Sequence, residues 1–164
     1  MSYSSEIISG GGRANKTGNH LERFVEHQLQ DLGYIERIGR NKHTAANTNT
    51  ENGAYYGKQA RFGKSIYNTD RVCDFLIFHK ALWPNSLVIE CKWQQAKGSV
   101  DEKYPFAVLN IEKLGVPTIL LLDGGGYKPE ALVWLKSQAG PEKALIGVYT
   151  MSEFQTIIND GFLG

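Results

Sequence analysis

Apolar and polar residues alternate one by one along residues 86–94, which read Ser-Leu-Val-Ile-Glu-Cys-Lys-Trp-Gln. Successive side chains of a β-strand point to opposite faces, so this stretch predicts a strand with one apolar and one polar face. The apolar face would consist of Leu87, Ile89, Cys91 and Trp93. The polar face would consist of Glu90, Lys92 and Gln94. Burying charge is costly unless the charge is paired or bound to a metal. The pattern therefore predicts either an edge strand whose polar face meets water or a buried strand whose charged groups have a function.

The same reading of periodicity and turn residues predicts the other elements. Apolar residues at helical spacing predict an amphipathic helix from about Asn19 to Leu32, ended by Gly33. Other strands are predicted over 34–38, 71–78, 117–122 and 144–149, and other helices over 105–114, 129–138 and 152–158. The Ser- and Gly-rich residues 1–17 predict a flexible arm. Residues 18–164 then form a single domain, with a basic insertion at about 39–70.

The charge of the chain is unevenly distributed, although the net charge is only +1. Residues 36–71 carry seven Lys or Arg against three acids, a net charge of +4, which leaves −3 for the remainder. Residues 39–69 lack clear periodicity, and a loop of this length is usually functional or disordered. Basic residues suit phosphates and aromatic rings suit stacking on bases, so DNA contact and disorder are both open interpretations. The candidate DNA contacts are Arg40, Lys42, Tyr55, Tyr56, Lys58, Arg61 and Lys64.

Several other sites and destinations are not supported by the sequence. Cys73 and Cys91 are not in a Cys-x-x-Cys pair, so neither zinc nor a disulfide framework is indicated. The four histidines have no metal-binding spacing, and the glycines at 124–126 lack the lysine and spacing of a phosphate-binding loop, which favours a turn. No 18-residue apolar run or signal-peptide pattern occurs. We therefore expect a soluble, cytoplasmic protein without membrane contact.

Two further acids are candidates to join the polar face of residues 86–94. Asp74 interrupts an apolar run that predicts a strand buried on both faces, where a carboxylate needs a partner or a cation. On a helical wheel of about 100° per residue, Glu22 lies beside Leu29 at the edge of the apolar stripe, and Glu26 lies towards solvent. If one acid of this helix faces inward, we expect it to be Glu22.

Carboxylates that converge near a sheet edge make an oxygen-rich site that suits Mg²⁺, for which Mn²⁺ can substitute. Such a cation polarises a phosphodiester and lowers the pKa of a bound water. The carbonyl group of Ile89 or Cys91 could add a backbone ligand. Lys92 could orient the water or contact the phosphate. Whether Lys92 acts as a base stays open, because acids raise the pKa of a lysine whereas burial and cations lower it.

The order of these residues resembles the PD-(D/E)xK nuclease superfamily. The resemblance rests on three segments, Gly18-Asn-His-Leu-Glu22-Arg, Arg71-Val-Cys-Asp74-Phe-Leu-Ile-Phe and Val88-Ile-Glu90-Cys-Lys92-Trp-Gln94. Cys73 stands where the motif has its proline. The resemblance implies an α/β, restriction-endonuclease-like core with a central mixed sheet of four to five strands flanked by helices.

The resemblance also implies a role for each matching residue. Asp74 and Glu90 would be metal ligands, Lys92 the catalytic lysine and Glu22 the helix acid that some families add. Gln94 matches a glutamine found after the lysine in several nucleases of this kind. Residues 98–105 look like a segment that follows the catalytic strand in some restriction-type enzymes, where Lys103 could reach the phosphate backbone; a solvated helix start is the alternative interpretation.

The leading hypothesis is an Mg²⁺-dependent DNA endonuclease, within that class a type II restriction-like, sequence-specific enzyme. Because cleavage of a duplex needs two sites, we expect a homodimer. A Holliday-junction resolvase and a homing or repair nuclease are the alternatives with the same chemistry. A non-catalytic DNA-binding module on the same fold would not need Glu22, Asp74, Glu90 and Lys92 together. A nucleotide-binding protein that uses Gly124–Gly126 is disfavoured by the incomplete glycine pattern.

Overall fold

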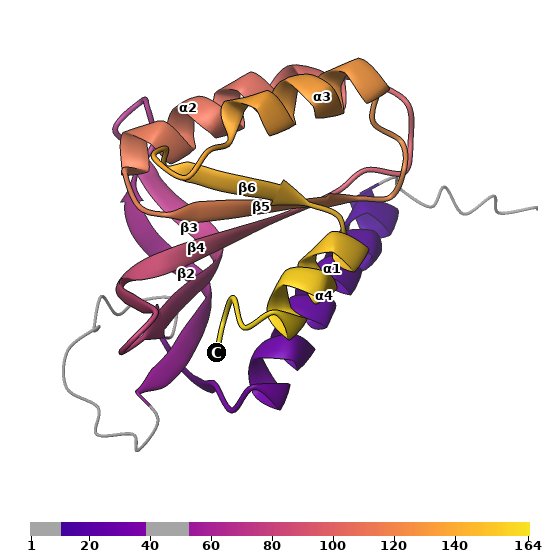
Figure 1. Ribbon diagram of the computed structural model, residues 1–164. Coiled ribbons are helices and arrows are strands. Elements are labelled where there is room, and N and C mark those ends of the chain that lie inside the picture. Colours follow the sequence, from indigo (N-terminus) through magenta and orange to yellow (C-terminus); the bar gives the residue numbers. More distant parts are fainter. Residues whose placement is uncertain (1–10, 39–52) are drawn as a thin grey trace, which may run out of the picture.

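The protein is an α/β fold built around one six-stranded mixed sheet, seen in a computed structural model that describes residues 11–38 and 53–164 (Figure 1). The strands lie in chain order across the sheet, β1 to β6. Their bounds are β1 Ile35–Ile38, β2 Ala54–Lys64, β3 Asp70–His79, β4 Trp83–Trp93, β5 Thr118–Asp123 and β6 Leu145–Tyr149. Strands β2, β3 and β4 pair antiparallel, whereas β1 with β2, β4 with β5 and β5 with β6 pair parallel.

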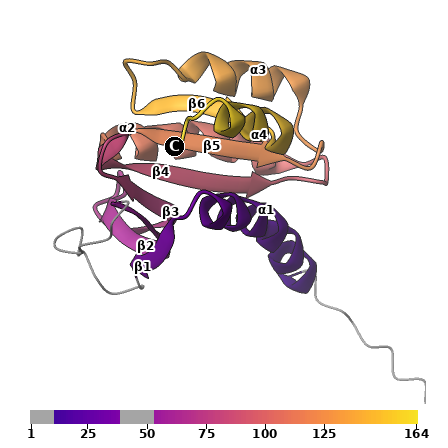
Figure 2. The same ribbon diagram turned by 60° about the horizontal axis from the view of Figure 1, so that its bottom comes forward.

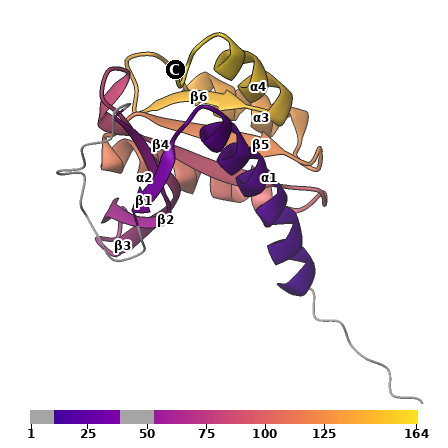
Figure 3. The ribbon, with the colours of Figure 1, turned by 90° about the horizontal axis from the view of Figure 1, so that it is seen from below.

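Helices cover both faces of the sheet. The helices are α1 Gly11–Asp31, α2 Tyr104–Leu114, α3 Pro129–Gln138 and α4 Met151–Asn159, with a short 3-10 helix, η1 Ser99–Lys103, before α2. Figures 2 and 3 show α1 and α4 on one face of the sheet, with α2 and α3 on the other. The long parallel connections through α2 and α3 produce this arrangement, because a parallel strand pair needs a crossover. No helix among the described residues is long and apolar enough to span a membrane.

The predicted elements after residue 70 are confirmed with shifts of a few residues, and the α/β core is confirmed with one more strand than expected. The additional strand is β2, which lies inside the predicted irregular insertion. Residues 39–52 of that insertion lie outside the described residues. Helix α1 begins at Gly11, so residues 11–17 of the predicted flexible arm are helical, and residues 1–10 of that arm lie outside the description. Helix propensity does not explain the earlier start, because the favourable Arg13, Ala14 and Lys16 stand among three glycines, an asparagine and a threonine.

The apolar face predicted for residues 86–94 packs against α1. Leu87 and Ile89 are fully buried in the core beneath α1 and α4, and Cys91 and Trp93 pack against it. The opposite face of β4 lies on the α2 side of the sheet, where Val88 is buried in a second cluster with the end of α2. The polar residues of β4 therefore follow Val88 on the α2 side.

The regular alternation of β2 and β3 is interrupted at one level of the sheet. In β3, Phe75 packs on the α1 side, but Cys73, two residues earlier, packs on the α2 side. In β2, Tyr56 and Ala60 show the same reversal around Gln59, which has a positive φ of 48°. An irregular residue of this kind changes which side chains share a face. The reversal occurs at Gln59 and Asp74, next to the polar residues of β4.

Candidate active site

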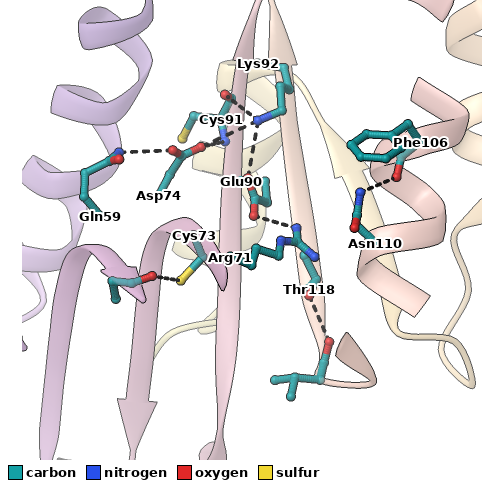
Figure 4. A network of polar contacts seen from close by, with 12 residues as sticks. Gln59, Arg71, Cys73, Asp74, Glu90, Cys91, Lys92, Phe106, Asn110 and Thr118 are labelled. Atoms are coloured by element: carbon teal, nitrogen blue, oxygen red, sulfur yellow. Dashed lines mark hydrogen bonds and ion pairs between the residues drawn. The ribbon is translucent and has the colours of Figure 1, made fainter. Parts of the chain in front are cut away.

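Asp74 lies where β3 and β4 separate. The registered pairs between these strands end at Phe75–Ile89, and beyond that point β3 pairs with β2 while β4 pairs with β5. Asp74 Oδ2 accepts a hydrogen bond from the backbone N–H of Cys91 at 2.8 Å, which replaces the missing ladder bond. Figure 4 shows the Asp74 carboxylate held across this opening. The carboxylate is thus fixed in place by the main chain of β4.

Glu90 is the most enclosed acid of the group, with its side chain 8% exposed. The guanidinium of Arg71 donates to Glu90 Oε1 at 2.7 Å, and the ammonium of Lys92 lies 3.3 Å from Glu90 Oε2 (Figure 4). A buried carboxylate needs such partners, because burial of an unpaired charge costs several kcal/mol. Arg71 reaches Glu90 because the reversal at Asp74 turns the start of β3 to the α2 side.

The Lys92 ammonium lies among three oxygens of the chain. Its Nζ is 3.3 Å from Glu90 Oε2, 3.8 Å from Asp74 Oδ2 and 3.5 Å from the Cys91 carbonyl oxygen. Burial lowers the pKa of Lys92, but the charges of Glu90 and Asp74 outweigh that effect and raise its pKa above the ordinary value. Lys92 is therefore a cation here and occupies a position that attracts positive charge.

These oxygens fit a hard divalent cation. The donors are two carboxylates and one backbone carbonyl, the oxygen ligands that Mg²⁺ and Mn²⁺ prefer. The thiol of Cys91 does not join them, because burial raises its pKa well above the usual value and the side chain packs against the core under α1. No group of three or more His, Cys, Asp or Glu side chains arranged for a metal occurs in residues 11–38 and 53–164. The fit thus depends on Asp74, Glu90 and the Cys91 carbonyl.

Glu22 reaches the same cluster from α1. The side-chain amide of Gln59 donates to Asp74 Oδ1 at 3.1 Å and to Glu22 Oε2 at 3.5 Å, and so connects the two acids. Burial and the neighbouring charge of Asp74 raise the pKa of Glu22. The helical wheel predicted that Glu22 is the acid that faces inward, and its position in the structure agrees with that prediction. Glu26, however, does not face solvent, because it accepts a hydrogen bond from Lys58 at 2.6 Å.

Gln94 lies away from the carboxylates, although it shares their face of β4. Its side chain is buried and donates to Asp101 Oδ1 and to the Gly126 carbonyl oxygen, each at 3.2 Å, and it accepts from the Tyr104 hydroxyl. The glycine turn after β5 approaches closely here, since the Gly126 N–H donates to the Gln94 carbonyl at 2.7 Å. This arrangement anchors the start of α2 to the end of β4.

The candidate DNA contacts are only partly available for binding. The expectation of base stacking is wrong for Tyr55 and Tyr56, which are 5% and 1% exposed; Tyr55 stacks on Phe78 with ring centroids 4.6 Å apart. Lys58 is not free, because it pairs with Glu26 on α1. Arg61, also on β2, is exposed to solvent. The remaining candidates are Lys64, which pairs with Asp70, the exposed Lys103, and Arg40 and Lys42, which lie outside the described residues.

Arg71 and Gln59 are the members of the cluster that sequence reasoning missed. Strict alternation from Phe75 would place Arg71 on the α1 side, away from Glu90, so the sequence pattern pointed in the wrong direction. Gln59 lay in the segment expected to be irregular. Nothing in the sequence indicated that Gln59 would connect Glu22 of α1 with Asp74 of β3.

Comparison with known proteins gives one family. A family model described as the PD-(D/E)XK nuclease superfamily domain matches residues 13–162, which includes every described strand and helices α2 to α4 completely. The comparisons with curated proteins and with solved structures gave no match. The matched range contains Glu22, Asp74, Glu90 and Lys92.

Proposed function

The chain belongs to the PD-(D/E)XK nuclease superfamily, and on that premise we propose that it is a divalent-metal-dependent endonuclease that hydrolyses DNA phosphodiester bonds. The observation that carries the proposal is the position of the Lys92 ammonium, which has oxygens of Asp74, Glu90 and Cys91 within 4 Å. These oxygens converge on one point, which a divalent cation could occupy in place of the ammonium.

Asp74, Glu90 and the Cys91 carbonyl would hold the metal, with Glu22 close by through Gln59. We propose Mg²⁺, with Mn²⁺ as a substitute, because all three donors are oxygens. When bound, the ion supplies an activated water and neutralises the charge that develops on the phosphate. Arg71 holds Glu90 in position from the opposite side.

Lys92 would move from the carboxylates to the substrate when another cation takes its place. Its side chain is 42% exposed, so its ammonium can turn without unpacking the core. A raised pKa means that Lys92 carries a positive charge at neutral pH in the metal-free protein. We therefore assign it to the phosphate or to orientation of the water, where a fixed positive charge stabilises the transition state.

Within this activity, we propose a restriction-like enzyme that cuts duplex DNA at a specific sequence as a homodimer. A Holliday-junction resolvase is the alternative with the same side chains. The substrate separates the two, because a resolvase nicks a four-way junction symmetrically and leaves plasmid DNA intact.

The test is cleavage of supercoiled plasmid and of a synthetic four-way junction, with Mg²⁺ or with EDTA. Lys92→Ala should lower the rate at least about 100-fold, as loss of one transition-state contact does. Lys113→Ala is the matched control, since Lys113 is an exposed lysine at the end of α2 outside the site.

Discrete plasmid fragments that require Mg²⁺ would support the restriction-like enzyme, and cutting of the junction alone would support the resolvase. Full activity of Lys92→Ala or activity in EDTA would refute the proposed chemistry. Calorimetric titration of Mn²⁺ gives an independent measurement, because Asp74→Asn should weaken metal binding even if no substrate has been found.

A further inference from the structure

A hollow of about 350 Å³ opens beside the candidate active site, on the α2 side of the sheet. Glu90 and Lys92 form part of its wall, together with Arg71. Phe106 and Asn110 of α2, which are labelled in Figure 4, also line it. The hollow has the size of small-ligand pockets, which begin at about 300 Å³. The mechanism proposed above gives no role to Tyr67 and Phe106, which also line the hollow.

Two aromatic side chains stand at the hollow with much of their surface in solvent. Tyr67 is 71% exposed and Phe106 is 42% exposed, and their ring centroids lie 5.6 Å apart at an interplanar angle of 30°. Large aromatic side chains usually bury most of their surface in a folded domain, so an exposed pair calls for a partner. Flat aromatic faces next to a phosphodiester site are suited to stacking on nucleobases.

Arg71, one of the residues that line the hollow, has an unused hydrogen-bond donor. Arg71 Nη1 is buried without a hydrogen-bond partner in the part of the chain that the structure describes, whereas Nη2 donates to Glu90. Asn110, by contrast, is occupied, since it accepts from the Ile66 N–H and donates to the Phe106 carbonyl. A buried donor without a partner costs free energy, and an acceptor brought by a ligand would remove that cost.

We propose that this hollow receives one extrahelical nucleobase of the DNA substrate strand, next to the phosphodiester that is cut. The base would stack on Phe106 and Tyr67, and one of its carbonyl oxygens or ring nitrogens would accept from Arg71 Nη1. A base that is stacked and paired inside a duplex cannot enter the hollow, so it must be extruded or already unpaired. The inference depends on the proposed nuclease function, because it places the pocket beside the cleaved bond.

The side chains that line the hollow indicate which class of ligand it would bind. A free phosphate would need cations that are not already neutralised, but both cations of this wall, Arg71 and Lys92, pair with Glu90. A planar heterocycle instead uses aromatic surface and one or two hydrogen bonds. A nucleobase therefore fits the walls better than an anion does.

The test compares two duplex oligonucleotides that each contain one unpaired nucleotide, which carries a base in one and is abasic in the other. Binding is measured by fluorescence anisotropy in Ca²⁺, and cleavage in Mg²⁺. We expect the protein to bind the base-containing duplex about tenfold more tightly, the range of one stacked base. Phe106→Ala and Tyr67→Ala should abolish this difference, and Phe106→Tyr should keep it. Leu109→Ala is the control, an exposed apolar residue of α2 that does not line the hollow.

Equal binding and cleavage of the two duplexes by the unmodified protein would overturn the inference and leave the nuclease function intact. A preference that survives in both Phe106→Ala and Tyr67→Ala would also overturn it. Absence of cleavage on every substrate would refute the nuclease function. The difference in anisotropy between the base-containing and abasic duplexes would then still decide whether the hollow binds a base.

Discussion

Replacement of Arg71 by methionine tests whether the start of β3 holds Glu90 in place. The change keeps an unbranched aliphatic stem but shortens the side chain and removes the guanidinium that donates to Glu90 Oε1 at 2.7 Å. Both side chains are largely enclosed, at 12% and 8% exposure, so water cannot replace the lost donor freely. We expect Arg71→Met to destabilise the fold and to weaken metal binding by Glu90.

The expected loss of stability follows from the burial of the pair. Removing one member of a buried ion pair costs about 3–5 kcal/mol, because the other charge stays behind without its partner. Here the Lys92 ammonium remains 3.3 Å from Glu90 Oε2 and offsets part of that cost. We therefore expect a decrease of about 2–3 kcal/mol in the free energy of unfolding. For a chain of this length, that corresponds to a Tm lower by roughly 5–10 °C.

Urea unfolding followed by tryptophan fluorescence measures this change, since Trp93 lies on β4 next to the cluster. Lys64→Met is the matched control, because it breaks an ion pair at the surface. The side chains of Lys64 and Asp70 are 56% and 59% exposed. An exposed pair contributes about 0–1 kcal/mol, so the control should unfold close to the unmodified protein.

A double-mutant cycle with Glu90→Leu provides the result that would refute the reasoning. If Arg71 and Glu90 support each other, the double variant should be more stable than the sum of the two single losses predicts, by about 1–3 kcal/mol. Additive losses, or a loss below about 0.5 kcal/mol for Arg71→Met alone, would show that the guanidinium does not hold Glu90 in solution.

Three further predictions concern the frame around the site. Thr150→Ala removes the capping box in which the hydroxyl accepts from the Glu153 N–H at 3.2 Å, and should cost about 1 kcal/mol in urea unfolding. Gly124→Ala places a Cβ 2.5 Å from the Gln94 carbonyl oxygen at a φ of +104°, and should cost at least about 2 kcal/mol. Burial raises the pKa of the Cys73 thiol to about 12, so alkylation at pH 8 should require unfolding. Because that thiol pKa is raised in the folded state, its effect on stability is absent below the unfolded value of about 8.5 and grows unfavourable as pH rises towards 12.

Each of these predictions has an opposing outcome. Unchanged unfolding of Thr150→Ala, compared with Thr156→Ala in the same helix as control, would show that the cap is not formed. Native-like stability of Gly124→Ala would show that the turn can move away from Gln94. Rapid alkylation of native Cys73, detected by mass spectrometry, would contradict its burial on the α2 side of β3.

The sequence determined most of the secondary structure and the identity of the acids. Alternation along residues 86–94, the apolar run around Asp74 and the helical spacing around Glu22 are local patterns, and local geometry is enough to interpret them. The same patterns named Asp74, Glu90 and Lys92, and the fold brings oxygens of Asp74 and Glu90 within 4 Å of the Lys92 ammonium. Their grouping agrees with the sequence interpretation; their roles in cleavage are the subject of the proposal.

Tertiary structure alone decided the partners of these residues. A residue of positive φ at Gln59, opposite Asp74, reverses the faces of two paired strands and moves Arg71 to the side of Glu90. The same pairing buries Tyr55 and Tyr56 within the sheet instead of exposing them to DNA. Sequence periodicity assigns faces by counting residues, and one irregular residue changes the count for the rest of the strand. Whether such a residue occurs depends on the neighbouring strand, which lies far away along the chain and is fixed only when the sheet assembles.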